Sequence, residues 1–247
     1  MATTAAPGIT PISTAAAPSE RRACTVIRVA GTAALVLTVA FLVILPTKPV
    51  HENIAGFNNP LLSFELASRP EHVFGVLGRP GDPGREDAVR RTDLGNRIDF
   101  LFMIAYPTLF AGIALLLESH GSITRTTRQA MVALAVVMAL ADALENRQLL
   151  FLSGATDPAA MQPWLRRLQV FTRIKWYAIF LATAVLAAGI WREREWWRWS
   201  APFFALAALC GALSFVYLPA IEIGMYVLTI GWIMAYVRAW RGAAVSA

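Results

Sequence analysis

Acidic side chains occur near one end of several long apolar segments of this chain. A charged group inside the hydrocarbon region of a bilayer costs roughly 2.5 to 3.5 kcal/mol by insertion scales, so such groups are usually paired or functional. Carboxylates in that setting can exchange protons or cations, or act as general acids. The residues concerned are Asp99, Asp142, Glu145 and Glu222, with Lys175 at the corresponding end of another apolar segment.

The composition explains why these carboxylates are unusual. Hydrophobic residues make up 57% and charged residues 15% of the 247 residues, and the mean hydropathy is +0.53. These values are too apolar for a soluble domain of this length. A membrane-spanning helix needs about 20 apolar residues. The sequence therefore predicts an all-α integral membrane bundle of six transmembrane helices, at about 27–45, 98–117, 130–150, 176–191, 200–218 and 220–236.

The basic residues and the cysteines exclude some functions. The formal net charge is +6 and the pI is near 9.9, but the arginines flank apolar segments. They are therefore interpreted as anchors at the membrane surface, with lipids rather than nucleic acid as their partners. Cys24 and Cys210 are the only cysteines, which is too few for zinc–thiolate chemistry.

The amino-terminal region sets the predicted orientation. Residues 1–22 are rich in Ala, Thr, Pro and Ser and are predicted to be a disordered tail, followed by a single transmembrane domain over 23–247. Basic residues precede the first apolar segment, which lacks a cleavage site at its end. We therefore expect an uncleaved anchor in a bacterial plasma membrane, with a cytoplasmic amino terminus. The segments 118–129, 192–199 and 237–247 should share that side.

The segment 47–97 is the longest stretch between predicted spans, and long loops commonly carry function. Ser68 to Glu71 form a capping-box pattern, which predicts a short helix that ends at Gly78. A Pro-Gly turn then precedes a charged helical stretch from Arg85 to Leu94. The segment is therefore a candidate lid on the membrane domain.

Within this lid, Pro60 to Ala67 is apolar and too short to span a bilayer. It should lie on the bilayer or dip into the helical bundle. Glu65 in its middle is unexpected on a surface that faces only lipid.

Hairpin geometry predicts that the polar side chains lie at one depth. Equal counting from the turn near Ser122 places Asp99 level with Glu145, because both helices rise by the same distance per residue. Asp142 and Asn146 share a helix face with Glu145. The predicted layer near the non-cytoplasmic face contains Asp99, Asp142, Glu145, Asn146, Arg147, Arg173, Lys175 and Glu222.

Tyr106 and Pro107, which lie deeper in the second span, extend this layer. Tyr106 is seven residues after Asp99 and therefore lies on the same helix face, two turns further into the membrane. Pro107 follows and predicts a kink that frees a backbone carbonyl. Together these features predict a polar pocket that opens to the outside.

A structural role explains part of the same pattern. Asp142 with Arg173 or Lys175 could form an ordinary ion pair that fixes helix register. Asp99 with Arg97 or Arg147 could do the same. Asn146 fits this explanation less well, because an amide needs a specific hydrogen-bonding partner.

Three short motifs in this region resemble those of a known group of proteins. They are Phe64-Glu65-Leu66-Ala67, Asp99-x-x-Phe102-x-x-x-Tyr106 and Asp142-x-x-Glu145-Asn146. In this order they are similar to F-E-L-A, D-x-x-F-x-x-x-Y and D-x-x-E-N elements of small bacterial multi-pass membrane proteins of unknown function. The resemblance covers Pro60 to Leu152 and implies a multi-pass fold without implying an activity. It suggests one site made of Glu65, Asp99, Tyr106, Asp142, Glu145 and Asn146.

Three functions remain open from the sequence. The first is binding or transport of a small molecule, lipid headgroup or cation through the carboxylate pocket. The second is a membrane-embedded enzyme in which Glu145 or Asp142 is a general acid toward a lipidic substrate and Tyr106 donates a hydrogen bond. The third is a structural subunit of a membrane complex.

No cofactor or metal is predicted. The sequence has no pair of intramembrane histidines for haem, and no P-loop, G-x-S-x-G or H-E-x-x-H motif. The lid does contain several side chains that can bind metals, but in such a segment they are more often solvated. They are His51, Glu52, Glu65, Glu71 and His72.

Overall fold

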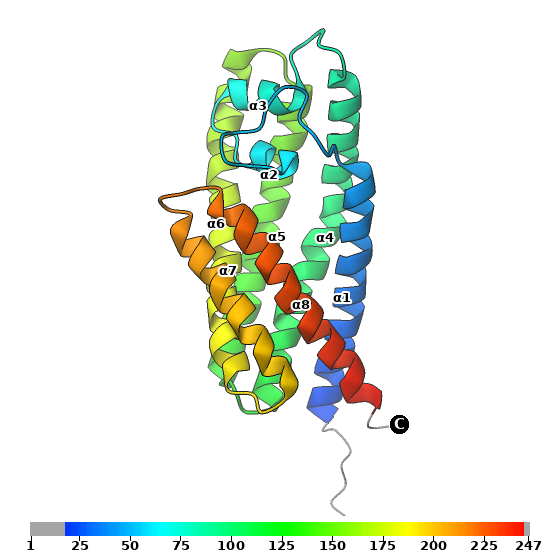
Figure 1. Ribbon diagram of the computed structural model, residues 1–247, viewed down its shortest axis with the longest axis vertical. Coiled ribbons are helices and arrows are strands. Elements are labelled where there is room, and N and C mark those ends of the chain that lie inside the picture. Colours follow the sequence, from blue (N-terminus) through cyan, green and yellow to red (C-terminus); the bar gives the residue numbers. More distant parts are fainter. Residues whose placement is uncertain (1–17, 245–247) are drawn as a thin grey trace, which may run out of the picture.

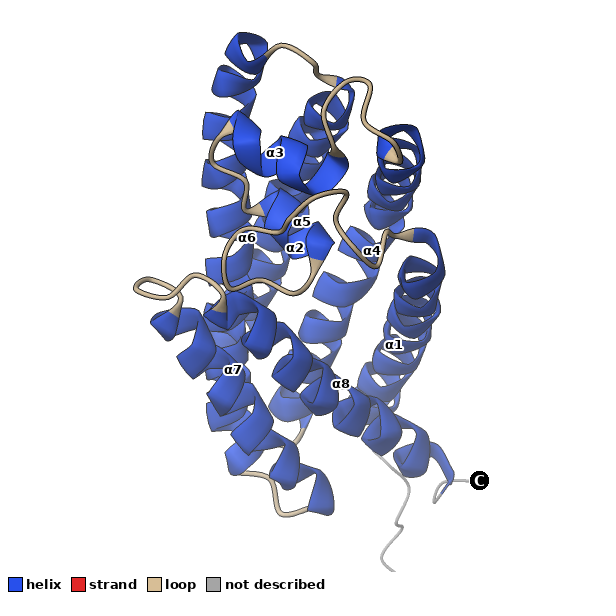
Figure 2. Cartoon of the chain, turned by 45° about the horizontal axis from the view of Figure 1, so that its top comes forward, coloured by secondary structure: helices blue, strands red, loops and turns tan. Residues whose placement is uncertain are grey.

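A computed structural model describes residues 18–244, which fold into helices without any strand (Figures 1 and 2). The all-helical prediction is therefore confirmed for this part of the chain. The helices are α1 (Pro18–Ile44), α2 (Pro60–Glu65), α3 (Pro70–Leu77), α4 (Arg85–Ser119), α5 (Arg125–Gly154), α6 (Pro158–Trp191), the 3-10 helix η1 (Trp196–Ser200), α7 (Ala201–Leu213) and α8 (Ala220–Ala244).

Five of these helices, α1, α4, α5, α6 and α8, are long and apolar enough to cross a membrane. The span predicted at 200–218 forms only the 13 residues of α7 and is followed by turns up to Pro219. At 1.5 Å per residue, α7 is about 20 Å long, which is shorter than the hydrocarbon core of a bilayer. The structure therefore has five candidate spans and one shorter helix, and the predicted count of six spans is not confirmed.

The long helices lie side by side and alternate in direction. α4, α5 and α6 form the centre, α1 packs against α4, and α7 packs against α6. α8 runs obliquely between α7 and α1 (Figure 1). The start of α1, the α4–α5 turn, the α6–α7 connection and the end of α8 consequently lie at one end of the molecule, as the hairpin count predicted.

The segment between α1 and α4 covers the opposite end (Figures 1 and 2). Asn59 caps α2, because its side-chain oxygen accepts a hydrogen bond from the backbone N–H of Leu61 at 2.9 Å. Phe64 and Leu62 of α2 are buried. α2 therefore dips into the bundle, which was one of the two alternatives expected for this segment.

The predicted helix α3 is present, but its capping is different. It ends at Leu77 with Gly78 as its C-cap, as expected. Its N-cap residue is Arg69, which makes no side-chain capping bond. The Ser68 hydroxyl lies 3.4 Å from Nδ1 of His72 instead, so the predicted capping box does not form.

Two further boundaries differ from the predictions. Residues 18–22 belong to α1, so the prediction of disorder is wrong for them, and residues 1–17 lie outside the described residues. The charged stretch from Arg85 and the span from Ile98 form one continuous helix. α4 also continues through Pro107, whose backbone lacks only one donor in a helix supported by neighbours on both sides.

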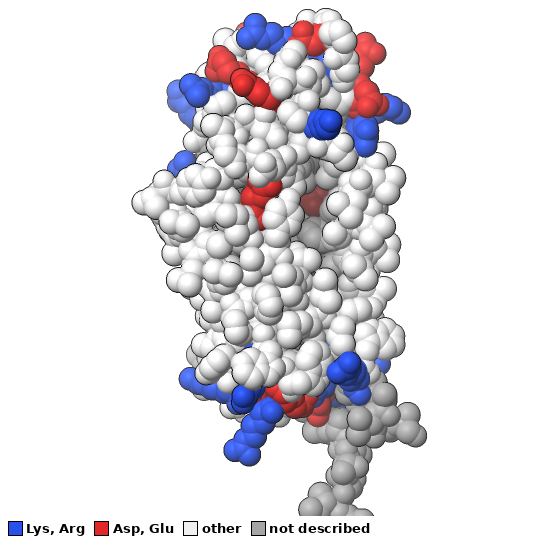
Figure 3. All heavy atoms as spheres, viewed as in Figure 1, with Lys and Arg blue, Asp and Glu red and all other residues white. Residues whose placement is uncertain are grey.

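The surface shows how this bundle would lie in a membrane. Charged side chains gather at the two ends, and the band between them is almost uncharged (Figure 3). Large apolar side chains are exposed in that band, for example Val36 and Leu42 on α1 and Leu209 on α7. Exposed apolar side chains in such a band are stable against lipid tails, so the protein is a membrane protein.

The end that carries both described termini is held by ionic contacts between four elements. Nδ1 of His120, after α4, lies 2.7 Å from Glu193, after α6, and its Nε2 lies 3.5 Å from Glu20 of α1. Arg238 of α8 contacts Glu20 at 2.8 Å and Glu195 at 2.5 Å. The contacts therefore link α1, α4, α8 and the segment after α6.

Reporter fusions test the predicted topology. Fusions after Pro60 and Pro219 should report the extracytoplasmic side, and fusions after Ser122 and Glu195 should report the cytoplasm. The physical reason is that basic residues before the first span favour a cytoplasmic amino terminus. The reverse pattern would place α2 and α3 on the cytoplasmic side.

The ionic contacts of His120 with Glu193 and Glu20 should also make the stability of the protein depend on pH. The hydrogen bond with Glu193 raises the pKa of His120 above its ordinary value of 6.5. A raised pKa in the folded state means that the stabilisation is complete below about pH 6.5 and is lost as pH rises through the folded-state pKa. The melting temperature in detergent should therefore fall between pH 6 and pH 8 by more in the native chain than in His120→Gln. Equal pH dependence in both proteins would contradict this.

Candidate functional site

The polar side chains inside the bundle surround the ammonium group of Lys175 on α6. Its Nζ lies 3.1 Å from Glu65 Oε2, 3.3 Å from Asp142 Oδ1 and 2.8 Å from Glu145 Oε2. All four side chains are buried, and Glu145 is completely inaccessible. One cation therefore bridges α2, α5 and α6.

A lysine suits this position better than an arginine would. Its ammonium is a compact charge with three donors, which can point to three separate carboxylates, whereas a guanidinium is a planar fork that matches one or two. Lys175 and Lys48 are the only lysines among the 22 Lys and Arg residues of the chain. We call Lys175 together with Glu65, Asp99, Asp142 and Glu145 the carboxylate–lysine cluster.

Asp99 of α4 is the member of this cluster without a cation. Its carboxylate accepts a hydrogen bond from Nδ2 of Asn146 at 2.7 Å, and no basic group of the described residues lies within 4.0 Å of it. Arg97 and Arg147, its expected partners under a structural explanation, are exposed. The alternative ion pair between Asp142 and Lys175 does form.

One buried polar group next to these acids has no hydrogen-bonding partner among the described residues. It is the amide nitrogen of Asn96, a residue that is only 2% exposed. The equally buried Tyr106 hydroxyl lies beside the Asp142 carboxylate, which can accept a hydrogen bond from it. A buried polar group without a partner costs about 1 to 3 kcal/mol, so the Asn96 amide needs an explanation.

The helices position this cluster through their periodicity. Asp142, Glu145 and Asn146 are one turn apart on α5, as predicted, and all three are buried. Glu65 reaches the cluster because α2 is held against α6, where the Thr172 hydroxyl donates to the backbone oxygen of Glu65 at 3.1 Å. The lid thus supplies one of the carboxylates.

The six residues predicted as one site therefore lie together around Lys175, while a ligand-binding role for them stays a prediction. Other members of the predicted layer do not join them. Arg147 and Arg173 are exposed. Glu222 accepts a hydrogen bond from the backbone N–H of Asn58 at 2.9 Å and thereby attaches the lid to α8.

Sequence analysis did not identify Asn96 and Thr172. Asn96 is three residues before Asp99 on α4 and faces the same side, so its spacing was a usable signal. Thr172 is three residues before Lys175 in the same way. Uncharged polar side chains near the end of an apolar segment cost little free energy in a membrane, so the sequence alone does not distinguish these two residues from ordinary ones.

The metal-binding side chains of the lid do not form a site. His51 pairs with Asp82 at 2.6 Å on the surface, and His72 bonds to Ser68. Within residues 18–244 no group of three or more His, Cys, Asp or Glu side chains is arranged to hold a metal ion.

A small hollow, which we call the polar hollow, opens beside the cluster. Figure 3 shows acidic atoms inside a depression on the face turned to the viewer. Its lining combines polar and apolar side chains, including Glu65, Asn96, Asp99, Asn146, Phe41 and Leu61.

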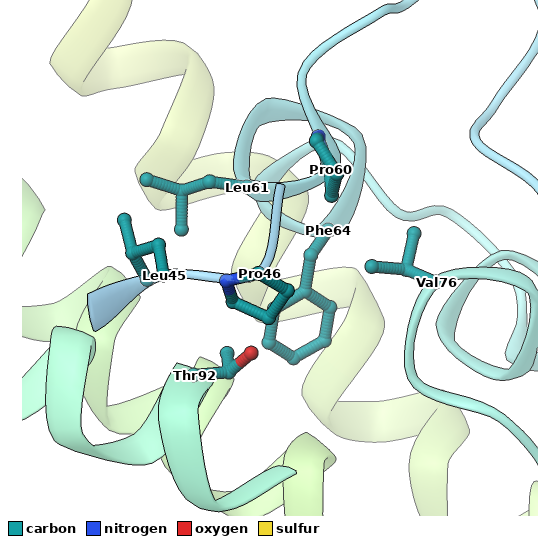
Figure 4. A pocket seen from close by; sticks show the side chains of 7 residues that line it. All are labelled: Leu45, Pro46, Pro60, Leu61, Phe64, Val76 and Thr92. Carbon is teal, nitrogen blue, oxygen red and sulfur yellow. The ribbon is translucent and has the colours of Figure 1, made fainter. Parts of the chain in front are cut away.

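A second hollow, which we call the apolar hollow, adjoins the first beneath α2 and α3 (Figure 4). The two share Leu45 and Leu61. Its lining is apolar except for Thr92 and consists of Leu45, Pro46, Pro60, Leu61, Phe64, Val76 and Thr92.

No family model, curated protein or solved structure matches this chain. The resemblance to the bacterial group with F-E-L-A, D-x-x-F-x-x-x-Y and D-x-x-E-N motifs therefore stays a prediction. Function has to be argued from the chemistry of the cluster and the hollows.

Removal of the central cation should destabilise the protein. Lys175→Met leaves three buried carboxylates without their partner, which should cost about 3 to 5 kcal/mol. Adding Glu145→Gln should restore part of that loss, because one buried charge is removed with it. Unfolding in detergent measures both, and Lys48→Met, at an exposed position, is the control. No recovery in the double variant would mean that the two side chains are not coupled.

Proposed function

We propose that this protein binds or transports a small molecule, lipid headgroup or cation at the carboxylate–lysine cluster. The observation that carries the proposal is the charge imbalance of the cluster. The cluster holds four carboxylates and one lysine, which contacts three of them, so with all groups ionised the formal charge is 1 − 4 = −3. Such an excess in a bundle interior is costly unless protons or a positively charged group compensate it.

A purely structural role explains the arrangement less well. Ion pairs that only fix helix register need one acid for each base, and apolar side chains of similar size often stabilise a buried site equally well. Here Asp99 has no basic partner within 4.0 Å, and the Asn96 amide nitrogen has no hydrogen-bonding partner among the described residues. Buried polar groups that have no partner inside the protein are typical of a site that binds another molecule.

The proposed location of this site follows from the topology. With a cytoplasmic amino terminus in a bacterial plasma membrane, the cluster and its lid lie toward the extracytoplasmic side. Arg91 supports this depth, because it donates to the backbone oxygen of Ile44 at 2.7 Å and so marks the polar end of α1. Asp99 is eight residues further along α4, which is about 12 Å deeper into the bundle.

Two conservative variants should separate binding from folding. Tyr106→Phe removes one hydroxyl beside Asp142 and keeps the ring, and Asp99→Asn removes a charge while it keeps an oxygen for Asn146. Both should leave the melting temperature nearly unchanged. Both should reduce, by at least tenfold, the amount of any small molecule that remains bound during purification from native membranes, measured by native mass spectrometry.

The control for these variants is Tyr217→Phe, at an exposed tyrosine outside the cluster. It should change neither melting nor bound material. If Tyr106→Phe and Asp99→Asn lower the melting temperature together with bound material, the residues are structural. If they leave bound material unchanged, the cluster is not the binding site.

A further inference from the structure

We propose that the cation bound at the carboxylate–lysine cluster is a proton, which Asp99 carries and which one water molecule in the polar hollow delivers. This inference rests on the proposed binding function and selects one ligand among its alternatives. It follows from the size of the polar hollow, from a free oxygen of Asp99 and from the unpaired amide of Asn96.

The size of the polar hollow excludes larger ligands. Its volume is about 10 Å³, which is room for one water molecule. An organic amine or a lipid headgroup is larger than this space. A metal ion is small enough, but calcium and magnesium need six or more oxygen ligands, and Phe41 and Leu61 occupy part of the wall. A proton on a carboxyl group needs no further space.

Asp99 has an oxygen that can hold the proton. Its Oδ2 accepts a hydrogen bond from Nδ2 of Asn146 at 2.7 Å, and its Oδ1 has no hydrogen bond to the described residues. The side chain is half-buried and lines the polar hollow, so a water molecule there can reach it (Figure 3). The other three acids of the cluster contact Lys175, so Asp99 is the one whose negative charge has no partner.

The charged groups around Asp99 do not compensate its charge. The elements packed around it contribute Glu65 of α2, Tyr106 of α4, Asp142 and Glu145 of α5, Lys175 of α6, and Phe41 and Leu45 of α1. Only one of these side chains is a cation, and it already contacts three acids. Proton binding at Asp99 changes the formal charge of the cluster from −3 to 1 − 3 = −2, which removes part of the costly excess.

The water molecule is inferred from Asn96. Its amide nitrogen has no hydrogen-bonding partner among the described residues, and the residue lines the same hollow as Asp99. A buried water needs two to four polar partners, and here Asn96 offers a donor and Asp99 an acceptor. For proton uptake, a hydronium ion in the hollow breaks one O–H bond, passes that proton to Oδ1 of Asp99 and remains as water. Release reverses both steps.

The hollow lies close to the membrane surface. Arg97 is two residues before Asp99, which is about 3 Å along α4, and Arg147 follows Asn146 directly. Both arginines are exposed, and long basic side chains near the end of a span extend to the headgroup layer. Asp99 should therefore exchange its proton with the side of the membrane that carries the lid.

Infrared spectroscopy of the full chain tests the proposal, because the C=O stretch of a protonated carboxyl group is separate in frequency from the bands of an ionised one. In a detergent without carbonyl groups at pH 7, the native chain should show this stretch, and it should shift in D2O. Asp99→Asn, which resembles the protonated form, should lose the intensity of one carboxyl group. The matched control is Asp157→Asn, which replaces an exposed helix cap by another good cap and should leave the band unchanged.

Two further variants connect the band with the neighbours of Asp99. Asn146→Leu removes the hydrogen bond to Oδ2, so the frequency of the band should rise while its intensity is retained. This variant keeps the proposal testable if Asp99→Asn does not fold. Asn96→Leu replaces the unpaired amide by an apolar side chain of similar size and removes a partner of the water molecule. Hydrogen–deuterium exchange of the band should then slow at least tenfold.

Each contrary outcome overturns a defined part of the proposal. If the native chain shows no protonated carboxyl band, or if Asp99→Asn and Asn146→Leu both leave the band unchanged, Asp99 does not carry a proton. Unchanged exchange in Asn96→Leu would show that the water molecule is not the route. None of these results depends on material that co-purifies with the protein. A loss of such material in Asp99→Asn would therefore still support the proposed binding function when the proton is excluded.

Discussion

The interior of this protein depends on the burial of one ammonium group among carboxylates in a medium of low dielectric. Removing charges from water costs several kcal/mol for each ion, and only close contacts of opposite sign repay it. Lys175 makes such contacts with Glu65, Asp142 and Glu145. These residues come from three elements, so the cation fixes the relative positions of α2, α5 and α6.

The position of the lid follows from this interaction. α2 has only six residues and would not be stable alone, but it places Glu65 on Lys175 and its backbone accepts a hydrogen bond from Thr172. Gly95 allows the end of α1 to approach α4, because a Cβ atom at this position would collide with the Leu45 side chain. The hollows therefore form between the lid, which the Glu65–Lys175 contact holds in place, and the end of α1, which Gly95 allows to approach α4.

The opposite end of the bundle is organised differently. There His120, Glu193 and Arg238 form ionic contacts, and the buried side chains of Glu193 and Arg238 each lie against a group of opposite charge. Those contacts connect chain segments that α8 brings together by its oblique path. Charge at that end has a partner, whereas Asp99 in the cluster has no cation. The difference supports a structural role at one end and a binding role in the interior.

Periodicity and hydropathy sufficed to predict the all-helical class, the hairpin order and the face shared by Asp142, Glu145 and Asn146. These features are local or follow from counting along helices of constant rise. The lengths of two helices were not predicted: α7 stops at Leu213, and the helical stretch predicted from Arg85 continues without a break into the span from Ile98. Which acid lacks a cation was likewise decided by tertiary structure. Lys175 could have paired with any nearby carboxylate, and only the packing of α2 against α6 directed it to Glu65 and left Asp99 facing a hollow.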